Sequence, residues 1–249
     1  MATSTDKPNA ACSPEFPETR WTMVMSAGRE SSPDSRRALT ELCEQYWHPL
    51  YAYARRRAAN LHEAQDLTQG FFAELLEKNY AGTATPQRGR FRGFLLTAFK
   101  HFMSKQWEKA RAQKRGGGHV PISLDFKSAD SGLQLEPAGG LTPEQLYDKQ
   151  WGLTLLDRVM DRLQHDFEST GKSGQFEALK GFLIGDHPGQ TYADVAVELS
   201  MTESAVKKAA SRMRQRYRRL LREEIRQTVS CPEDVEDELR RLFTVLGMS

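Results

Sequence analysis

The segment from Glu203 to Arg226 constrains the chain most, because it combines a continuous apolar stripe with charge of mostly one sign. Its apolar residues recur at three- and four-residue spacing, as in an amphipathic helix; they are Val206, Ala210, Met213, Tyr217, Leu220 and Leu221. Nine basic residues in this segment oppose three acidic ones, a net charge of +6. A face that only keeps a protein soluble usually mixes the two signs. The pattern therefore predicts a helix that packs on one side and contacts DNA on the other.

The residues before this segment predict how the helix is held. Thr191–Asp194 has the form of a capping box, which starts a short helix over 192–199. Ser200–Thr202 forms a turn, and Thr202 or Ser204 caps the next helix. A short helix, a turn and a basic helix make a helix-turn-helix, whose second helix enters the major groove. The polar residues left facing outward are Lys207, Lys208, Ser211, Arg212, Gln215 and Arg218.

The rest of the chain also shows helical spacing and no period-2 strand of useful length, which predicts an all-α fold. We expect helices over 62–78, 91–115 and 175–184, one from about residue 35, one starting near Thr142, and one in the tail after Cys231. Residues 116–141 are rich in Gly and Pro and lack periodicity, so they predict a flexible linker. The expected organisation is an N-terminal arm (1–34), two small helical domains (35–115 and 142–228) joined by that linker (116–141), and an acidic tail (229–249).

A second basic region lies in the first of these domains. Between Pro86 and Arg115, nine basic residues face one acidic residue, a net charge of +8. The interleaved Phe residues sit at helical spacing and are interpreted mainly as core, whereas Trp107 is the better candidate for an exposed ring that stacks on bases. Two basic units on one chain gain avidity when they bind the same DNA, or they read two promoter elements a fixed distance apart.

Composition and motifs argue against several other classes of protein. Cys12, Cys43 and Cys231 lie far apart and predict neither a disulfide framework nor a zinc site. No apolar run reaches the roughly 18 residues of a membrane span, and the N-terminus lacks a signal peptide, so a cytoplasmic protein without a membrane partner is expected. Gly171–Ser173 lacks both the earlier glycine and the strand of a phosphate-binding loop. We therefore expect no metal, no cofactor and no enzymatic activity of its own.

The segment Glu63–Phe72, with the sequence EAQDLTQGFF, resembles the AEDLTQEVF signature of bacterial RNA polymerase sigma factors. Thr191–Arg219 is similar to the C-terminal helix-turn-helix of the same family, and the order of the two motifs across a linker resembles the minimal extracytoplasmic-function (ECF) class of the sigma-70 family. The resemblance covers Ser35 to Arg226. The chain departs from the family's pattern at Gly70, where an acidic residue is usual, and at Ser200, where glycine is common.

The resemblance implies a region 2-like domain (35–115), which binds core RNA polymerase and melts promoter DNA, and a region 4-like domain (142–228), which binds the upstream promoter element. It implies core binding through Asp66, Gln69, Phe72 and Leu75. It implies contacts with the melted region and the downstream element through Arg92, Lys100, Lys105, Trp107, Lys109 and Arg111. Contacts with the upstream element are expected from Thr202, Ser204, Lys207, Lys208, Ser211, Arg212 and Gln215.

The acidic tail lies outside the family's common pattern. In residues 227–249 five acidic residues oppose two arginines, a net charge of −3. We hypothesise that this tail folds back over the basic helix, as self-inhibition, or replaces a separate anti-sigma factor. Two other functions stay open: a helix-turn-helix transcription regulator that never contacts core polymerase, and a nucleic-acid-processing enzyme with a helix-turn-helix appendage. The signature around Asp66 favours the sigma factor over a plain regulator, which does not need it.

Overall fold

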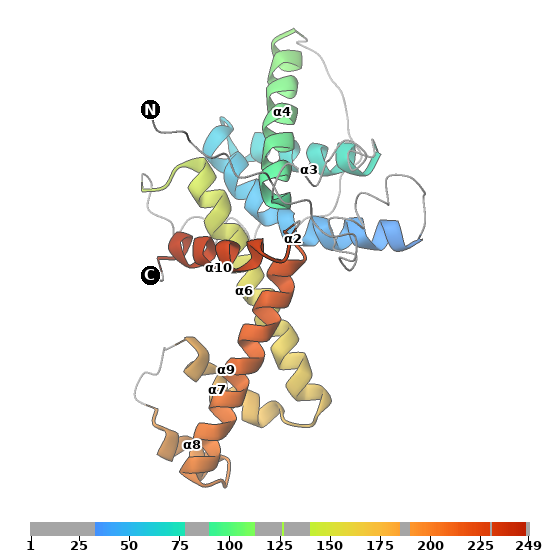
Figure 1. Ribbon diagram of the computed structural model, residues 1–249. Helices are drawn as coiled ribbons and strands as arrows, with labels where there is room; N and C mark the ends of the chain where they lie inside the picture. Colours follow the sequence, from blue (N-terminus) through green and yellow to red (C-terminus); the bar gives the residue numbers. More distant parts are fainter. Residues whose placement is uncertain are drawn as a thin grey trace, which may run out of the picture.

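The computed structural model describes residues 33–77, 90–112, 126, 140–184, 190–229 and 231–247, and every regular element among them is an α-helix. The prediction of an all-α fold is therefore confirmed. The helices, shown in Figure 1, are α2 (Pro33–Arg57), α3 (Leu61–Glu77), α4 (Phe91–Ala112), α6 (Pro143–Ser169), α7 (Ser173–Ile184), α8 (Tyr192–Glu198), α9 (Glu203–Arg226) and α10 (Asp234–Val245). The N-terminal arm up to residue 32 and most of the linker lie outside the described residues, so the two-domain arrangement stays a prediction.

Helices α2, α3 and α4 pack around a core of aromatic rings. The ring of Phe71 on α3 lies 5.0 Å from that of Phe99 and 5.7 Å from that of Phe102, both on α4. Phe91 and Met103 are also buried. The interpretation of most α4 phenylalanines as core is confirmed, with Phe94 half-buried beside them.

Helix α6 connects the two ends of the molecule. It begins with a capping box in which the Thr142 hydroxyl accepts a hydrogen bond from the Gln145 amide, while the Gln145 side chain accepts one from the Thr142 amide. It packs along α2, and it also contacts α7 and α9. The long helices α6 and α9 lie side by side and carry α7 and α8 at the end opposite to α4 (Figure 1). We call the pair of helices α6 and α9 the stalk.

Helices α8 and α9 form the expected helix-turn-helix. The capping box predicted from the sequence is present, since the Thr191 hydroxyl accepts from the Asp194 amide and the Asp194 carboxylate accepts from the Thr191 amide. In the turn, Ser200 has a φ of 51°, a left-handed conformation that favours glycine. Serine stands here where sigma factors commonly have glycine, and the backbone keeps a conformation that glycine adopts easily.

The amphipathic helix expected in the tail is present as α10. Its Leu239 and Leu242 are buried, and α10 contacts both α6 and α9. A Cβ atom built on Gly152 of α6 would lie 2.7 Å from a methyl carbon of Leu242, so a larger residue there would force the Leu242 side chain to move. The tail is thus packed at the base of the stalk, near the C-terminal end of α9.

Candidate nucleic-acid interface

The outer face of α9 presents a row of polar and basic side chains. Val206, Ala210 and Met213 are buried on the inner side of the helix. The residues expected at the upstream element are all exposed: Thr202, Ser204, Lys207, Lys208, Ser211, Arg212 and Gln215. The Thr202 hydroxyl accepts the Ala205 amide at 3.3 Å, so this side chain also caps the helix.

The helix-turn-helix is held in place by contacts among α7, α8 and α9. The rings of Phe182 and Tyr192 stack with centroids 4.4 Å apart. The Arg214 guanidinium donates to the Tyr192 hydroxyl at 2.6 Å and to the Phe182 carbonyl at 3.2 Å. Hydrogen bonding to Thr191 lowers the pKa of Asp194, because these bonds favour the charged carboxylate. Arg214 is therefore a structural residue, although it belongs to the basic segment.

The cations of the α9 face differ in how they are paired. Lys207 forms an ion pair with Glu203 at 2.6 Å, and the hydrogen bond to Glu203 raises the lysine's pKa. Within the part of the chain that the structure describes, the side chains of Lys208 and Arg212 have no ion-pair partner. Because an unpaired cation loses no internal contact when it binds a phosphate or a base, these two side chains are the best placed for nucleic acid.

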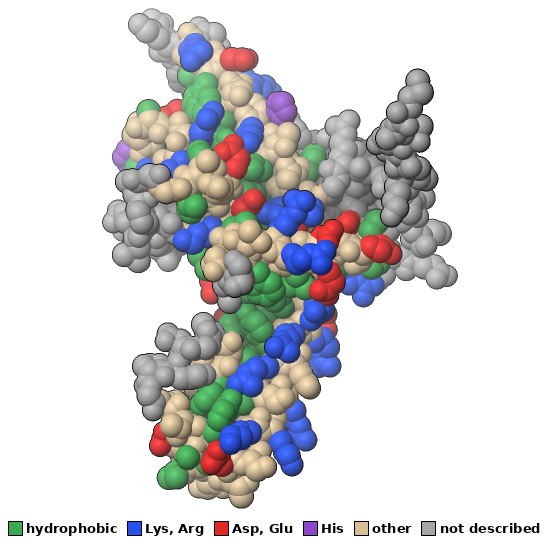
Figure 2. Space-filling model, turned by 60° about the vertical axis from the view of Figure 1, so that its left-hand side comes forward, with side chains coloured by type: hydrophobic (Ala, Val, Ile, Leu, Met, Phe, Trp, Pro, Cys, Tyr) green, Lys and Arg blue, Asp and Glu red, His purple; other side chains and the backbone are tan. Residues whose placement is uncertain are grey.

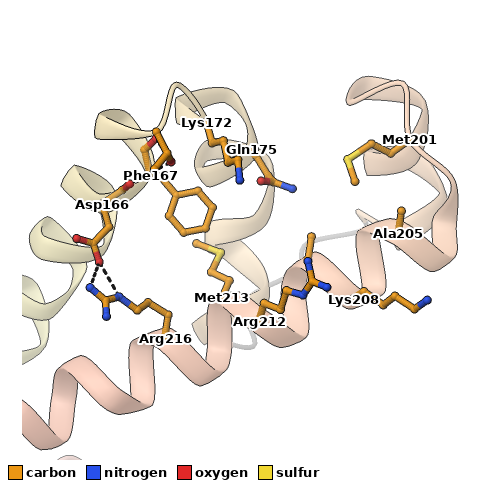
Figure 3. Close-up of a pocket in the computed structure, with 12 residues that line it drawn as sticks. Asp166, Phe167, Lys172, Gln175, Met201, Ala205, Lys208, Arg212, Met213 and Arg216 are labelled. Carbon is orange, nitrogen blue, oxygen red and sulfur yellow. Dashed lines mark hydrogen bonds and ion pairs between the residues drawn. The ribbon is translucent and has the colours of Figure 1, made fainter.

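Lys208 and Arg212 line a pocket of about 410 Å³ between α9 and the corner where α6 meets α7 (Figure 3). Phe167 and Met213 supply apolar lining, while Lys172 and Gln175 come from the opposite wall at the start of α7. Arg216, another pocket residue on α9, is already neutralised, since its Nε donates to the Asp166 carboxylate at 2.7 Å. The pocket therefore offers three cations, Lys172, Lys208 and Arg212, that have no acidic partner among the described residues, on two sides of one hollow.

Lys172 is a candidate that sequence reasoning missed. In the sequence, Gly171–Ser173 suggests only a phosphate-binding loop, and the absence of the earlier glycine and of a strand argues against that interpretation. The structure places Lys172 opposite α9 because Gly171, with a φ of +68°, turns the chain sharply between α6 and α7. The signal in the sequence was a glycine followed by a basic residue at a helix boundary, and this signal alone is weak.

The basic face continues along the C-terminal half of α9. Lys and Arg side chains run in line down the lower arm of the molecule in Figure 2. Arg218 and Arg219 are exposed, and the Nε of Arg222 donates to the Glu236 carboxylate of α10 at 2.8 Å. The acidic tail therefore neutralises the far end of the basic face and leaves its N-terminal half open.

The second basic region, on α4, is exposed mainly at its C-terminal end. Lys109 and Arg111 are exposed, and Lys105 lies 3.7 Å from the Glu74 carboxylate. Lys100, nearer the middle of the helix, forms an ion pair with Glu144 at 2.7 Å. Of the residues expected at the melted region, Lys105, Lys109 and Arg111 are thus best placed to contact DNA.

The structure corrects the expectation for Arg92. This side chain is buried, with 7% exposed, and its guanidinium is held by the carboxylates of Glu238 and Asp148 and lies 4.6 Å from the Trp151 ring centroid. Burial acts to lower the arginine's pKa, but the two carboxylates outweigh it and raise the pKa. In this structure Arg92 is an internal ion-pair residue, so it is not available to DNA.

The prediction of an exposed Trp107 is also wrong. The ring is half-buried and packs against the hydrophobic core, and its Nε1–H donates to the Glu63 carboxylate at 2.7 Å. Glu63 lies 44 residues away on α3, so local sequence could not indicate this partner. One edge of Trp107 still lines a pocket of about 480 Å³ between α3 and α4, together with His62, Asp66 and Gln106.

The α3 residues that the resemblance assigns to core polymerase fall into two groups. Asp66 is exposed and Gln69 is half-buried. Phe72 and Leu75 are 0% and 5% exposed and belong to the protein's own core, which corrects their expected role as surface contacts. Gly70 is buried too, and a Cβ atom there would lie 3.2 Å from the ring of Phe102, so a larger residue at this position would require the ring to shift.

Comparison with known proteins adds no family. No protein-family model, no curated protein and no solved structure matches this chain. Within the described ranges, no helix combines the length and apolar character that crossing a bilayer requires. The same residues contain no group of three or more His, Cys, Asp and Glu side chains suited to a metal ion. The features that bear on function are therefore the exposed residues of α3, α4 and α9.

Proposed function

We propose that the chain is a sigma factor of the ECF type, which binds core RNA polymerase and directs it to promoters. The observation that carries this proposal is the exposed face of α9, where Lys208 and Arg212, which pair with no described acidic residue, lie in a helix-turn-helix. A recognition helix in the major groove reads base edges with such side chains. The chemistry of transcription belongs to the polymerase, and this chain supplies promoter recognition in the cytoplasm.

At the upstream element, α9 would lie in the major groove with its N-terminal half against the bases. Arg and Lys bind guanine with two hydrogen bonds, and one good pair of this kind contributes about 1–3 kcal/mol of discrimination. Lys172, on the other wall of the pocket, would contact a phosphate of the same duplex and so fix the helix in the groove.

At the downstream element, the end of α4 would track single-stranded DNA. Lys105, Lys109 and Arg111 supply the positive charge that follows a phosphate backbone. Trp107 lies on the neighbouring pocket wall, and stacking on a base would require it to give up its hydrogen bond to Glu63. Unpaired bases that gain such contacts offset part of the lost base pairing.

Core polymerase would bind on the exposed side of α3. Asp66 lines the pocket between α3 and α4, and its exposed side chain would be accessible to a basic residue of the polymerase. This attachment is the feature that distinguishes a sigma factor from a plain regulator. The burial of Phe72 and Leu75 removes two expected contacts, and this observation favours the second candidate, a helix-turn-helix regulator that does not bind core polymerase.

The test is reconstitution of the full chain with core RNA polymerase on fragmented genomic DNA of the source organism, followed by mapping of RNA 5′ ends. The proposal predicts start sites that require the chain and share two upstream sequence elements. Lys208→Ala or Arg212→Ala should change the base preference at one position of the farther element, at a cost of about 1–3 kcal/mol. The absence of any chain-dependent start site would overturn the proposal, and DNA binding without core binding would establish the regulator.

A further inference from the structure

A buried ion-pair network at the base of the stalk joins the tail to the start of α4. Glu238 of α10 is 0% exposed and forms ion pairs with two arginines, Arg90 and Arg92. Arg92 also pairs with Asp148 of α6. The network thus includes charged groups from α4, α6 and α10, three elements far apart in the sequence.

Two further contacts fix the same junction. The Phe91 amide, at the start of α4, donates to the Thr228 carbonyl just after α9, with a distance of 3.3 Å. The Tyr147 hydroxyl of α6 donates to the Arg92 carbonyl at 2.9 Å. The first turn of α4 therefore contacts α6, the segment just after α9, and α10. These contacts hold α4 to the stalk.

The stalk itself is cross-linked along its length. Arg162 of α6 donates to Glu224 of α9 at 2.6 Å, and Glu224 is 1% exposed. Arg216 and Asp166 join the two helices nearer the helix-turn-helix. Because buried, hydrogen-bonded charges hold a specific geometry, these contacts favour a stalk that moves as one unit.

The two basic ends point away from each other. The first turn of α4 and the last turn of α9 meet at the junction, and the helices run from there toward opposite ends of the molecule (Figure 1). A rise of 1.5 Å per residue gives about 30 Å from Lys208 to Thr228 and about 27 Å from Phe91 to Lys109. The basic ends are then at most about 60 Å apart, the length of about 17 base pairs of B-form duplex.

We propose that Glu238 is a specificity-determining residue that fixes this separation, so that the protein selects promoters by the spacing between their two elements. The inference rests on the proposed sigma function. Glu238 contacts no DNA and acts as a positioning residue through Arg90 and Arg92. Replacing it with glutamine keeps the side-chain shape but removes the counter-charge that Arg90 and Arg92 share. Arg92 then keeps its ion pair with Asp148, and α4 is held less firmly to the stalk and the tail.

The test uses the full chain with core polymerase and the strongest promoter found in the reconstitution, with the spacer changed from −3 to +3 base pairs. The wild-type chain should lose about tenfold activity at ±2 base pairs, because the duplex must be twisted and stretched to reach both ends. Glu238→Gln should keep its activity at the best spacing within about twofold and lose less than about threefold at ±2. Asp237→Asn is the matched control, since Asp237 is exposed on the same helix and its ion pair among the described residues is with Arg240, next to it on α10.

A distance measurement separates this inference from the proposed function. Spin labels at Ala110 and Glu198, both exposed, report the separation of the two ends in the free chain without its native cysteines. We expect a narrow distribution of label distances in the wild type and in Asp237→Asn. We expect a broad distribution in Glu238→Gln. If circular dichroism shows that Glu238→Gln is misfolded, deletion of residues 231–249 must give the same two effects.

Each other result has a defined meaning. An unchanged spacing profile with a broadened distance distribution would overturn the role of Glu238 in promoter selection. An unchanged distance distribution in Glu238→Gln would overturn its role as a positioning residue. A wild-type chain that binds no core polymerase would overturn the proposed function and, with it, the selection of promoters by spacing. The distance measurement would still decide whether Glu238 fixes the separation of the two ends.

Discussion

The Trp107 indole donates a hydrogen bond to the Glu63 carboxylate at 2.7 Å, and this contact ties the last turns of α4 to the first turn of α3. The other oxygen of the same carboxylate accepts the Ala59 amide at 2.6 Å. One glutamate of the sigma-like segment therefore both orders the start of α3 and holds the ring beside the basic end of α4.

Removal of this carboxylate should release the ring. Glu63→Ala is expected to lower the free energy of unfolding by about 1–2 kcal/mol, because a hydrogen bond to a charged group is lost at a half-buried site. The tryptophan emission should also shift to longer wavelength as the indole meets water. Glu108→Gln, an exposed change next to Trp107, is the control and should alter neither quantity. Equal effects of the two variants would show that the bond contributes nothing.

Introduction at Gly70 of the acidic residue that is usual in the sigma-factor signature should destabilise the protein. Gly70→Glu places new atoms within 3.2 Å of the Phe102 ring and buries a carboxylate, so we expect a loss of about 1–3 kcal/mol in urea denaturation. Binding to core polymerase should not improve. Gln65→Glu, on the same helix but half-exposed, should change stability by less than about 0.5 kcal/mol. A stable Gly70→Glu protein would contradict the packing of α3 on α4.

Burial of His48 predicts a pH dependence of stability. Burial lowers the pKa of this imidazole below its ordinary value, so the folded state binds a proton less readily than the unfolded state. This contribution to stability is fully present above the ordinary histidine pKa of about 6.5 and is lost progressively as the pH falls below it. Thermal unfolding of His48→Gln should show a smaller slope in this range. His165→Gln, at an exposed position, should keep the wild-type slope.

Lys172 should contact a DNA phosphate rather than a base. Lys172→Ala is expected to weaken binding to all duplexes alike and to reduce the slope of log K against log salt by about 1. Lys180→Ala is the control, because Lys180 lies on the same helix α7, outside the pocket, and pairs with Glu177. A change in sequence preference would show that Lys172 contacts a base instead, and unchanged binding with an unchanged salt slope would remove it from the interface.

The sequence predicted the helices of the described residues and the helix-turn-helix because those features depend on local spacing and capping. The capping boxes at Thr142 and Thr191 involve residues three apart, so they can be identified from short segments. The same reasoning failed for Arg92, whose partner Glu238 lies 146 residues away on the tail. Pairing at that range depends on how α10 packs on α6, which neither periodicity nor charge counting reveals.

The candidate site was predicted in part for a similar reason. A helical pattern gives the face of α9 directly, because the buried stripe defines the exposed side. On α3 the resemblance to sigma factors concerns residue types alone. It does not show that Phe72 and Leu75 lie in the core while Asp66 is exposed. Lys172 joins the pocket only through the turn at Gly171, which brings α7 opposite α9.

The equilibrium binding of the full chain to core RNA polymerase tests the central claim most directly. A sigma factor must bind core polymerase without promoter DNA, and we predict a saturable complex in fluorescence anisotropy. Asp66→Lys should abolish that complex, because it reverses the exposed charge on α3, while DNA binding through α9 stays intact. Asp161→Lys, an exposed change on α6, is the control and should bind core polymerase as the wild type does. No detectable core binding by the wild-type chain, with its DNA binding preserved, would contradict the sigma-factor account.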